Sequence, residues 1–296
     1  MEIRVLRYFL ETAREGNMTR AAERLFISQP TMSKQLKELE NELGAKLFIR
    51  SNYSIRLTEA GMLLRDRAED ILSLVDKTEA EFKSLEETNS GDIFVGAPES
   101  EAMSLFAEAV YSLQKNYPKI RCNIYSGNLS DVCERLDKGL LDFAIVMSYV
   151  DLSKYNYLEL PMKDTWGILM RKDDPLSGKN AFDVSDLDKL PLICSRQWID
   201  QESPRWLGSA AKDMNIVATY NLVYNGSVMV KAGMGYAVVL DKLVNTGEDS
   251  EVVFRPLSSV PQTEMYVIWR KYQTFTPIAD LLLQELTRRC FQVRIP

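Results

Sequence analysis

Apolar residues recur every three to four positions through the first part of the chain, a spacing typical of short amphipathic helices. In residues 1–57 the pattern predicts a first helix that stops at Gly16 and a second, MTRAAERLF, capped by Asn17 or Thr19. A third helix follows, capped by Ser28. At ~100° per residue its apolar positions form one narrow stripe, which we expect to hold the helix against its domain: Met32, Leu36, Leu39 and Leu43.

A longer periodic stretch covers residues 58–88, where Thr58 is placed to cap a single helix. Apolar positions in this stretch alternate in steps of four and three, as in a coiled-coil seam. The seam predicts pairing with a second copy of the chain, so we expect a dimerisation helix; packing of the same seam on its own domain is the alternative. Its positions are Leu64, Ala68, Ile71, Val75, Phe82 and Leu85, with Thr78 between them.

Residues 89–296 change character, because short apolar runs now alternate with amphipathic stretches. This alternation predicts a mainly parallel α/β architecture. The pattern occurs twice, so we expect two Rossmann-like lobes: lobe I from about 91–160 and 267–296, and lobe II from about 161–266. A helix is predicted over SPRWLGSAAKDMN (203–215), and the closing helix TPIADLLLQELTRRC is expected to return to lobe I.

The net charge of −6 conceals an asymmetry along the chain. Residues 1–57 hold ten Lys/Arg against seven Asp/Glu, or +3, whereas residues 58–88 carry −5 and residues 89–296 carry −4. A polyanion would therefore meet the first block. No apolar run approaches the roughly 18 residues of a membrane helix, and the N-terminus lacks the pattern of a signal peptide. We expect a cytoplasmic protein without membrane contact.

Histidine is absent and the four cysteines form no C-x-x-C pair, which argues against a zinc site and excludes a His-based triad. We expect no metal, no cofactor and no enzymatic activity. An enzyme using carboxylate or lysine chemistry remains an alternative, although no paired-acid or nucleophile-elbow spacing is present. A transport solute-binding protein is another, suggested by the two lobes and opposed by the missing signal peptide.

The start of the third helix has the composition of a surface that reads duplex DNA. In a helix-turn-helix the N-terminal part of the second helix enters the major groove, where Gln, Ser, Thr and Lys can bond base edges or phosphates. Proline in the first turn costs no helical hydrogen bond. An ordinary solvated helix face is the alternative for these residues alone: Gln29, Pro30, Thr31, Ser33, Lys34 and Lys37.

The run MTRAAERLFISQPTMSKQLKELENELGAKLFIRSNYSIRLTEAG resembles the LysR-type transcriptional regulators. The matching elements are A-A-x-x-L, S-Q-P, L-E-x-x-L-G, L-F-x-R and L-T-E-A-G. The resemblance implies a winged helix-turn-helix, a linker helix and a type II periplasmic-binding-protein-like effector domain. It implies double-stranded DNA, a small-molecule effector and a second copy of the chain as partners, in a homodimer or homotetramer.

Carried onto this chain, the resemblance assigns base and phosphate contacts to Gln29, Pro30, Ser33 and Lys34, with Thr31 and Lys37 in support. The wing would be FIRSNYSIRL, with Arg50 and Arg56 at the DNA backbone or minor groove. Family wings often carry further bases where this chain has Ser51, Asn52 and Tyr53, whereas this wing keeps only two arginines.

Sheets of this type bind ligands at the carboxyl ends of their strands, where helix N-termini point N–H groups into a cleft. The resemblance points to the same loops. Each polar residue there has helix capping as its alternative, and Arg196 favours an anion whereas Glu99 and Glu101 favour an amine-bearing or hydroxylated ligand. The expected effector-binding residues are Ser100, Glu101, Asn128, Ser148, Ser195, Arg196, Gln197, Gly226 and Ser227. Cys194 near these loops motivates a further alternative, a redox-sensing regulator of the same family.

Overall fold

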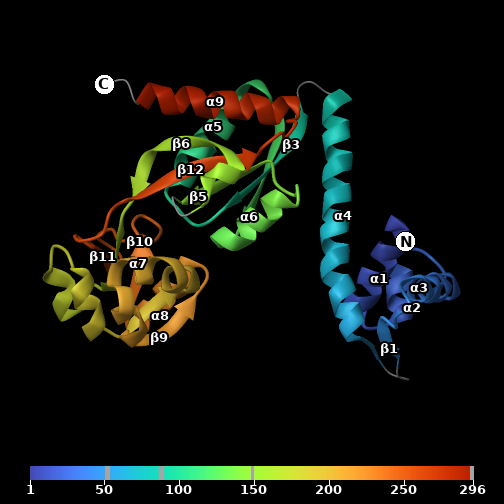
Figure 1. Ribbon diagram of the computed structural model, residues 1–296, viewed down its shortest axis with the longest axis horizontal. Coiled ribbons are helices and arrows are strands. Elements are labelled where there is room, and N and C mark those ends of the chain that lie inside the picture. The colour runs from blue at the N-terminus through green and yellow to red at the C-terminus, as the bar shows by residue number, and fades with distance from the viewer. Residues whose placement is uncertain (51–53, 87–89, 148–149, 294–296) are drawn as a thin grey trace. The chain divides into compact units, whose positions relative to one another are not determined.

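The computed structural model describes residues 1–50, 54–86, 90–147 and 150–293. The chain divides into two compact units, residues 1–82 and 83–296. Figure 1 shows that the first unit is mostly helical, whereas the second combines sheets and helices. No helix in these ranges is both long and apolar enough to cross a membrane.

The first unit is three short helices, a two-stranded wing and most of a long helix. The predicted stop and caps are confirmed: α1 ends at Gly16 with φ of 57°, Asn17 accepts from the N–H groups of Thr19 and Arg20, and Thr58 Oγ1 accepts from Gly61 N at 3.0 Å. The elements are α1 (Ile3–Glu15), α2 (Met18–Arg24), α3 (Gln29–Leu43), β1 (Phe48–Arg50), β2 (Ile55–Leu57) and α4 (Glu59–Glu86).

A buried carboxylate connects α3 to the wing. Glu40 is 4% exposed, and its Oε1 accepts from Leu47 N at 2.9 Å and from Phe48 N at 3.4 Å, while Lys46 Nζ lies 3.0 Å from its Oε2. Burial by itself would raise the pKa of Glu40, but the hydrogen bonds and the Lys46 charge together hold the pKa below its ordinary value. The side chain therefore stays ionised and orders the turn into β1.

The second unit contains two five-stranded mixed sheets. In lobe I, β3 pairs in parallel with β4 and β5, and β12 runs antiparallel to β5 and β6. Helices α5 and α9 share a hydrophobic core with this sheet, which confirms the return of the closing helix to lobe I (Figure 1). The order is β4-β3-β5-β12-β6, and the elements are β3 (Ser90–Ala97), α5 (Ala102–Asn116), β4 (Lys119–Ser126), α6 (Leu129–Asp137), β5 (Phe143–Met147), β6 (Tyr155–Asp164), β12 (Thr263–Arg270) and α9 (Pro277–Val293).

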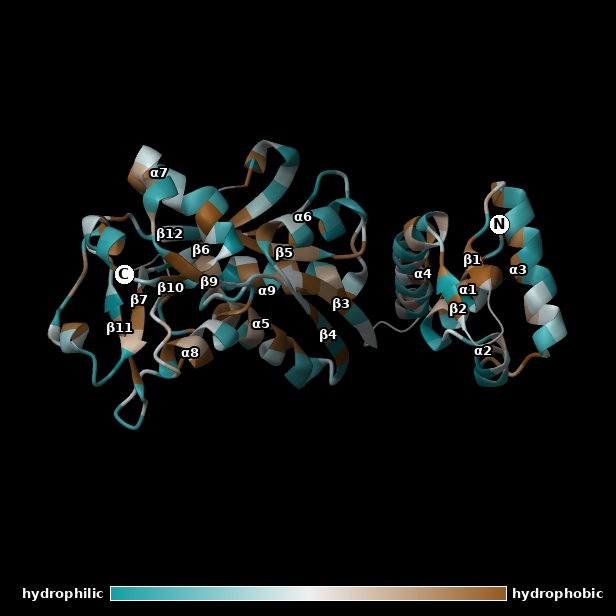
Figure 2. Ribbon diagram, turned by 90° about the horizontal axis from the view of Figure 1, so that it is seen from below, coloured by the Kyte–Doolittle hydropathy of each residue, from teal (hydrophilic) through white to brown (hydrophobic). Residues whose placement is uncertain are grey.

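Lobe II has the strand order β11-β7-β10-β8-β9, with β8 parallel to β9 and β10, and with β7 antiparallel to β10 and β11. Figure 2 shows strands of both lobes in brown, as apolar interiors, and largely polar positions along α3. The elements are β7 (Trp166–Arg171), β8 (Leu192–Ser195), α7 (Ser203–Leu207), β9 (Ile216–Tyr220), α8 (Val223–Lys231), β10 (Tyr236–Leu240) and β11 (Val252–Pro256). Short 3₁₀ turns cover Leu152–Lys154, Pro175–Gly178, Val184–Lys189 and Gly208–Asp213, and Trp198–Glu202 is a π-helical turn.

The chain crosses between the lobes at two neighbouring places. One lies between β6 and β7, around Thr165, and the other between β11 and β12. Trp166 Nε1 donates to Thr263 Oγ1 at 3.0 Å and so joins the two crossings. The expected boundaries near 160 and 266 fall inside β6 and β12, whereas the crossings lie between β6 and β7 and between β11 and β12.

The helix predicted over 203–215 is wrong beyond its first turn. Helix α7 ends at Leu207, and Gly208 adopts φ of 56°, a left-handed conformation that residues with a Cβ rarely adopt. A 3₁₀ turn over Gly208–Asp213 replaces the rest of the predicted helix.

We expect Glu40→Ala to lower the stability of the turn into β1 by about 1–3 kcal/mol, because two buried N–H groups lose their acceptor. Hydrogen exchange of the Leu47 and Phe48 amides, measured by mass spectrometry on the full chain, reports this opening. Glu38→Ala is the matched control, since Glu38 is exposed and makes only local contacts with Gln35 and Lys34.

The effect of Glu40 should depend on pH. Its pKa in the folded state is below the unfolded value, so its contribution is complete above the ordinary glutamate pKa of about 4.3 and is lost as pH falls through the lowered folded value. The difference between the wild type and Glu40→Ala in opening free energy should therefore shrink below about pH 4. A difference that stayed constant down to pH 2 would contradict this role.

Candidate functional site

The N-terminal turn of α3 presents the residues expected to contact DNA. Ser28 caps the helix, with its Oγ 3.3 Å from Thr31 N, and Pro30 lies in the first turn. Ser33 is half-buried, and the remaining candidates are exposed: Gln29, Pro30, Thr31, Lys34 and Lys37. The sequence thus placed these side chains on the outer side of the helix correctly.

The opposite face of α3 holds the helix to its domain. Met32 and Leu36 are 0% exposed and Leu39 is 2% exposed, as the predicted stripe requires. Leu43 is the exception, because its side chain is 43% exposed. It is the last helical residue before Gly44, whose φ is 66°, and the core does not extend under that last turn. The buried position is taken by Glu40 instead.

Two polar side chains on the outer face retain hydrogen-bonding capacity for a nucleic acid. Gln29 Nε2 lies 3.5 Å from the sulfur of Met18, which is a weak acceptor. The amide oxygen of Gln29 takes no part in that contact. Lys34 Nζ lies 3.9 Å from Glu38 Oε1 in an exposed pair. Pairs of this kind contribute little, so Lys34 can exchange Glu38 for a phosphate at low cost.

The wing is a short antiparallel pair in which Ile49 faces Arg56. Ile55 N donates to Gly16 O at 2.9 Å, which ties the wing to the end of α1. Arg56 is exposed on β2. The side chain of Arg50 and the residues Ser51, Asn52 and Tyr53 lie outside the described part of the chain.

The seam predicted along α4 is divided between two environments. Leu64 and Ala68 are 9% and 0% exposed in the core of their own unit, and Ile71 packs against that core. Leu64 and Ala68 are therefore occupied by the core of their own unit, whereas Ile71 is half-buried, and dimerisation through this seam stays a prediction. Val75 is half-buried, Phe82 is 68% exposed, and the side chain of Leu85 lies outside the described residues. The exposed apolar residues of α4 also include Leu63 at 63% and Leu74 at 43%.

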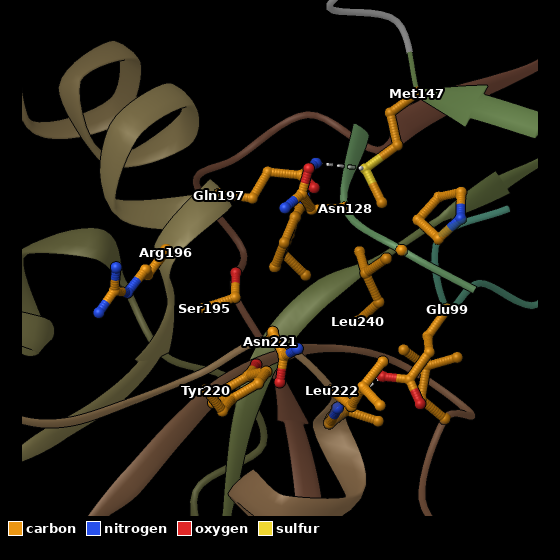
Figure 3. A pocket seen from close by; sticks show the side chains of 15 residues that line it. Glu99, Asn128, Met147, Ser195, Arg196, Gln197, Tyr220, Asn221, Leu222 and Leu240 are labelled. Carbon is orange, nitrogen blue, oxygen red and sulfur yellow. Dashed lines mark hydrogen bonds between the residues drawn. The ribbon is translucent and has the colours of Figure 1, made fainter. Parts of the chain in front are cut away.

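The second unit contains a cavity of about 120 Å³ where loops of both lobes meet (Figure 3). It is lined by Pro98, Glu99, Gly127, Asn128, Met147, Trp166, Ser195, Arg196, Gln197, Tyr220, Asn221, Leu222, Val223, Leu240 and Leu243. Four expected residues are among them: Asn128, Ser195, Arg196 and Gln197. The carboxyl ends of β3, β4, β5, β8, β9 and β10 all contribute.

Four other expected residues do not line this cavity: Ser100, Glu101, Gly226 and Ser227. Ser100 Oγ accepts from Ala102 N at 2.9 Å, and Glu101 occupies the position before α5. Gly226 lets α8 approach the Tyr220 ring, since a Cβ there would lie 3.0 Å from ring atoms. Ser227 is 3% exposed and donates to Tyr224 O at 2.7 Å. Ser148 lies outside the described residues.

Several lining residues escaped the expected set. Met147, Tyr220 and Leu240 end β5, β9 and β10, so the rule about carboxyl ends of strands would have found them had apolar residues been considered. Trp166 begins β7, whose antiparallel direction brings its amino end to the same edge. That strand was not predicted, and the sequence contained no signal for the direction of its pairing.

Polar groups from each lobe cap a helix of the other lobe at the cavity. Glu99, which follows β3 of lobe I, accepts through Oε2 from Val223 N, the first residue of α8, at 2.5 Å. Gln197, which follows β8 of lobe II, accepts through Oε1 from Leu129 N, the first residue of α6, at 3.2 Å. Figure 3 shows Arg196 directed away from Gln197, Asn128 and Leu240.

A cluster of indole rings supports one wall. Trp166 packs edge-on against Trp206 with ring centroids 5.6 Å apart, and Trp198 packs against the same ring at 5.7 Å. Within the described ranges, no three His, Cys, Asp or Glu side chains gather in a way that would hold a metal ion.

Cys194 does not have the properties of a sensor thiol. It is 0% exposed in β8, and burial raises its pKa to about 12. The thiolate is the reactive form, so this thiol is protonated at neutral pH and shielded from oxidants. Burial also raises the pKa of Cys122 and Cys133 to about 11.

Comparisons with known proteins match both the N-terminal helical unit and the two-lobed α/β unit. Residues 3–62 match the model for bacterial regulatory helix-turn-helix proteins of the lysR family, and residues 86–291 match the LysR substrate binding domain. Among solved structures, CbnR, a LysR family transcriptional regulator, superposes with a TM-score of 0.77 over 98% of this chain and 99% of its own, at 19% identity, which concerns the fold alone.

Two relatives support the assignment at the level of sequence. The HTH-type transcriptional regulator BudR of Raoultella terrigena is 30% identical over 279 residues, which cover 92% of this chain and 96% of BudR. The HTH-type transcriptional regulator YtlI of Bacillus subtilis is 33% identical over 230 residues, which cover 76% of this chain and 74% of YtlI. The chain belongs to the LysR family and is a transcriptional regulator with an N-terminal helix-turn-helix and a C-terminal substrate-binding domain.

Proposed function

We propose that this regulator reads duplex DNA with the first two turns of α3. The observation that carries the proposal is the division of that helix: Met32, Leu36 and Leu39 are buried, while Gln29 and Lys34 point outward. Gln can pair with adenine and Lys with guanine or phosphate in the major groove. Pro30, Thr31, Ser33 and Lys37 support the same surface, and Arg56 on the wing, with Arg50, adds backbone contacts.

The positive block in residues 1–57 is consistent with this role, because phosphate contacts supply most of the affinity of a DNA-binding surface. CbnR has been solved in complex with its target DNA, and that structure superposes on this chain with a TM-score of 0.76. We infer that the chain acts on chromosomal DNA in the cytoplasm and that its role is regulatory and not catalytic.

We further propose that the cavity between the lobes receives the small-molecule effector. It lies where strand ends and helix N-termini of both lobes converge, which is where ligands bind in sheets of this kind. A molecule that contacts Asn128 on one lobe and Ser195 on the other would change how the two lobes are held together. Cys194 offers no competing redox mechanism, since the thiol is buried and protonated.

A second copy of the chain is the remaining partner, and we propose that it packs on the exposed stripe of α4. Leu63 and Leu74 lie within 20° of each other on the helix at ~100° per residue, and both side chains are more than 40% exposed. This stripe replaces the assignment of Leu64 and Ala68. Pairing of two chains through this stripe would bring two DNA-binding units together, as a DNA site with two half-sites requires.

We expect Gln29→Ala to cost about 1–3 kcal/mol at the preferred sequence and to relax base preference at one position. Lys34→Ala should weaken all duplexes alike and reduce the salt slope by about 1. Fluorescence anisotropy with the region upstream of the gene and with a shuffled duplex measures both. Lys212→Ala, an exposed lysine of the α/β unit, is the control. Equal affinity of the wild type for both duplexes would refute sequence-specific binding.

Leu74→Glu should weaken self-association by roughly tenfold or more, because a carboxylate would be buried without a partner in the interface. Sedimentation velocity over micromolar concentrations of the full chain measures the change. Ser73→Glu is the matched control, since this exposed neighbour lies about 100° around the helix. If both variants associate like the wild type, the second copy docks elsewhere.

A further inference from the structure

The two helices that begin at the cavity are each capped by the opposite lobe. Glu99 of lobe I accepts from the first N–H of α8 in lobe II, and Gln197 of lobe II accepts from the first N–H of α6 in lobe I. The two caps differ in charge, because one is a carboxylate and the other is an amide. Figure 3 shows the Glu99 carboxylate beside Leu222, at the start of α8.

The carboxylate of Glu99 takes the position that an anionic ligand would otherwise use. A helix N-terminus attracts negative charge through its unpaired N–H groups and its dipole. In this cavity that attraction is already satisfied at α8 by Glu99, through a 2.5 Å hydrogen bond to Val223 N. A ligand carboxylate would compete with Glu99 for α8 and would be repelled by it elsewhere in the cavity.

The other charge in the lining does not compensate Glu99. Among the described lining residues, only Glu99 and Arg196 carry a charge, and Arg196 is directed away from the other labelled side chains (Figure 3). A ligand ammonium group is disfavoured as well, because the α8 dipole offsets the Glu99 charge and the remaining wall is largely apolar. Desolvating an ion against that wall is costly. The apolar part is formed by Met147, Trp166, Leu222, Val223, Leu240 and Leu243.

Two neutral polar side chains of the cavity, Ser195 and Asn128, are suited to a carbonyl oxygen. Ser195 Oγ accepts from Trp198 N at 3.0 Å, which leaves its proton for a ligand acceptor. Asn128 Oδ1 accepts from Asp131 N at 2.9 Å, which leaves the NH₂ group as a donor. Both side chains therefore donate into a space of about 120 Å³, similar to the roughly 150 Å³ that holds a benzene molecule.

We propose that the effector is a small uncharged molecule, about the size of one ring, that bears an amide or another carbonyl group, and that Glu99 excludes carboxylates. The inference rests on the proposed effector role of this cavity and specifies its chemistry. Glu99 acts as a specificity residue here, because it decides which charge the cavity accepts. It also contributes one of the two side-chain caps between the lobes.

The test compares two probes that have nearly the same shape and differ in charge, benzamide and benzoate. Isothermal titration calorimetry on the full chain at constant ionic strength should give an affinity for benzamide at least tenfold higher than for benzoate. Glu99→Gln keeps an acceptor at Val223 N while removing the charge, and should reduce that ratio to about threefold or less. Glu99→Ala vacates the α8 N-terminus and should gain binding of benzoate and of acetate.

Glu101→Gln is the matched control, because Glu101 is two residues away and does not line the cavity. It should retain the wild-type ratio, and circular dichroism should show that all variants remain folded. Wild-type protein that binds benzoate as well as benzamide, or that binds neither, overturns the proposal, as does an unchanged ratio in Glu99→Gln. DNA binding by the same preparations is measured by fluorescence anisotropy without benzamide or benzoate. A loss of DNA binding is thereby distinguished from a failure of the proposal about the effector.

Discussion

Helix N-termini are the constraint on which the functional parts of this protein depend. The first N–H groups of an α-helix have no partner inside the helix and must find one elsewhere. At α3 and α4 the partner is local, since Ser28 and Thr58 cap their own helices. At α6 a local cap, Asn128, is joined by Gln197 from the other lobe, and at α8 the partner is Glu99 from the other lobe. The local caps position a DNA-reading surface, whereas the distant caps connect two lobes around a cavity.

This difference explains how much of the molecule could be predicted from its sequence. Local caps are read from residues close together in the chain, so the stop of α1 at Gly16 and the N-terminal caps of α2 and α3 were predicted correctly. The predicted helix MTRAAERLF was two residues too long, because α2 ends at Arg24. The exposed side chains of α3 that were expected to contact DNA were predicted from the same short-range periodicity. Glu40 was missed because its partners lie beyond the helix, at Leu47 and Phe48, and a glutamate in a periodic helix is normally solvated.

The cavity was predicted only in outline for a related reason. The rule that ligands lie at the carboxyl ends of parallel strands identified the loops at Asn128 and Ser195–Gln197. It did not distinguish a serine that caps its own helix, such as Ser100, from one that faces the cavity. It also omitted the apolar wall, because Trp166 reaches the cavity through an antiparallel strand. The pairing directions are properties of the folded sheet, and one local segment does not contain them.

The long helix α4 shows how one apolar pattern can serve two partners in turn. Its seam begins against its own unit, where Leu64 and Ala68 complete the core, and continues past that core to Phe82, which is exposed. A heptad pattern records that a face is buried but not what buries it. Once the first part of the seam is used internally, the exposed apolar side chains of the helix include Phe82 further along the seam, and Leu63 and Leu74 about a quarter of a turn away. Dimerisation through Leu63 and Leu74, as proposed, would leave the core contacts of Leu64 and Ala68 in place, since the two pairs lie on different faces of the same helix.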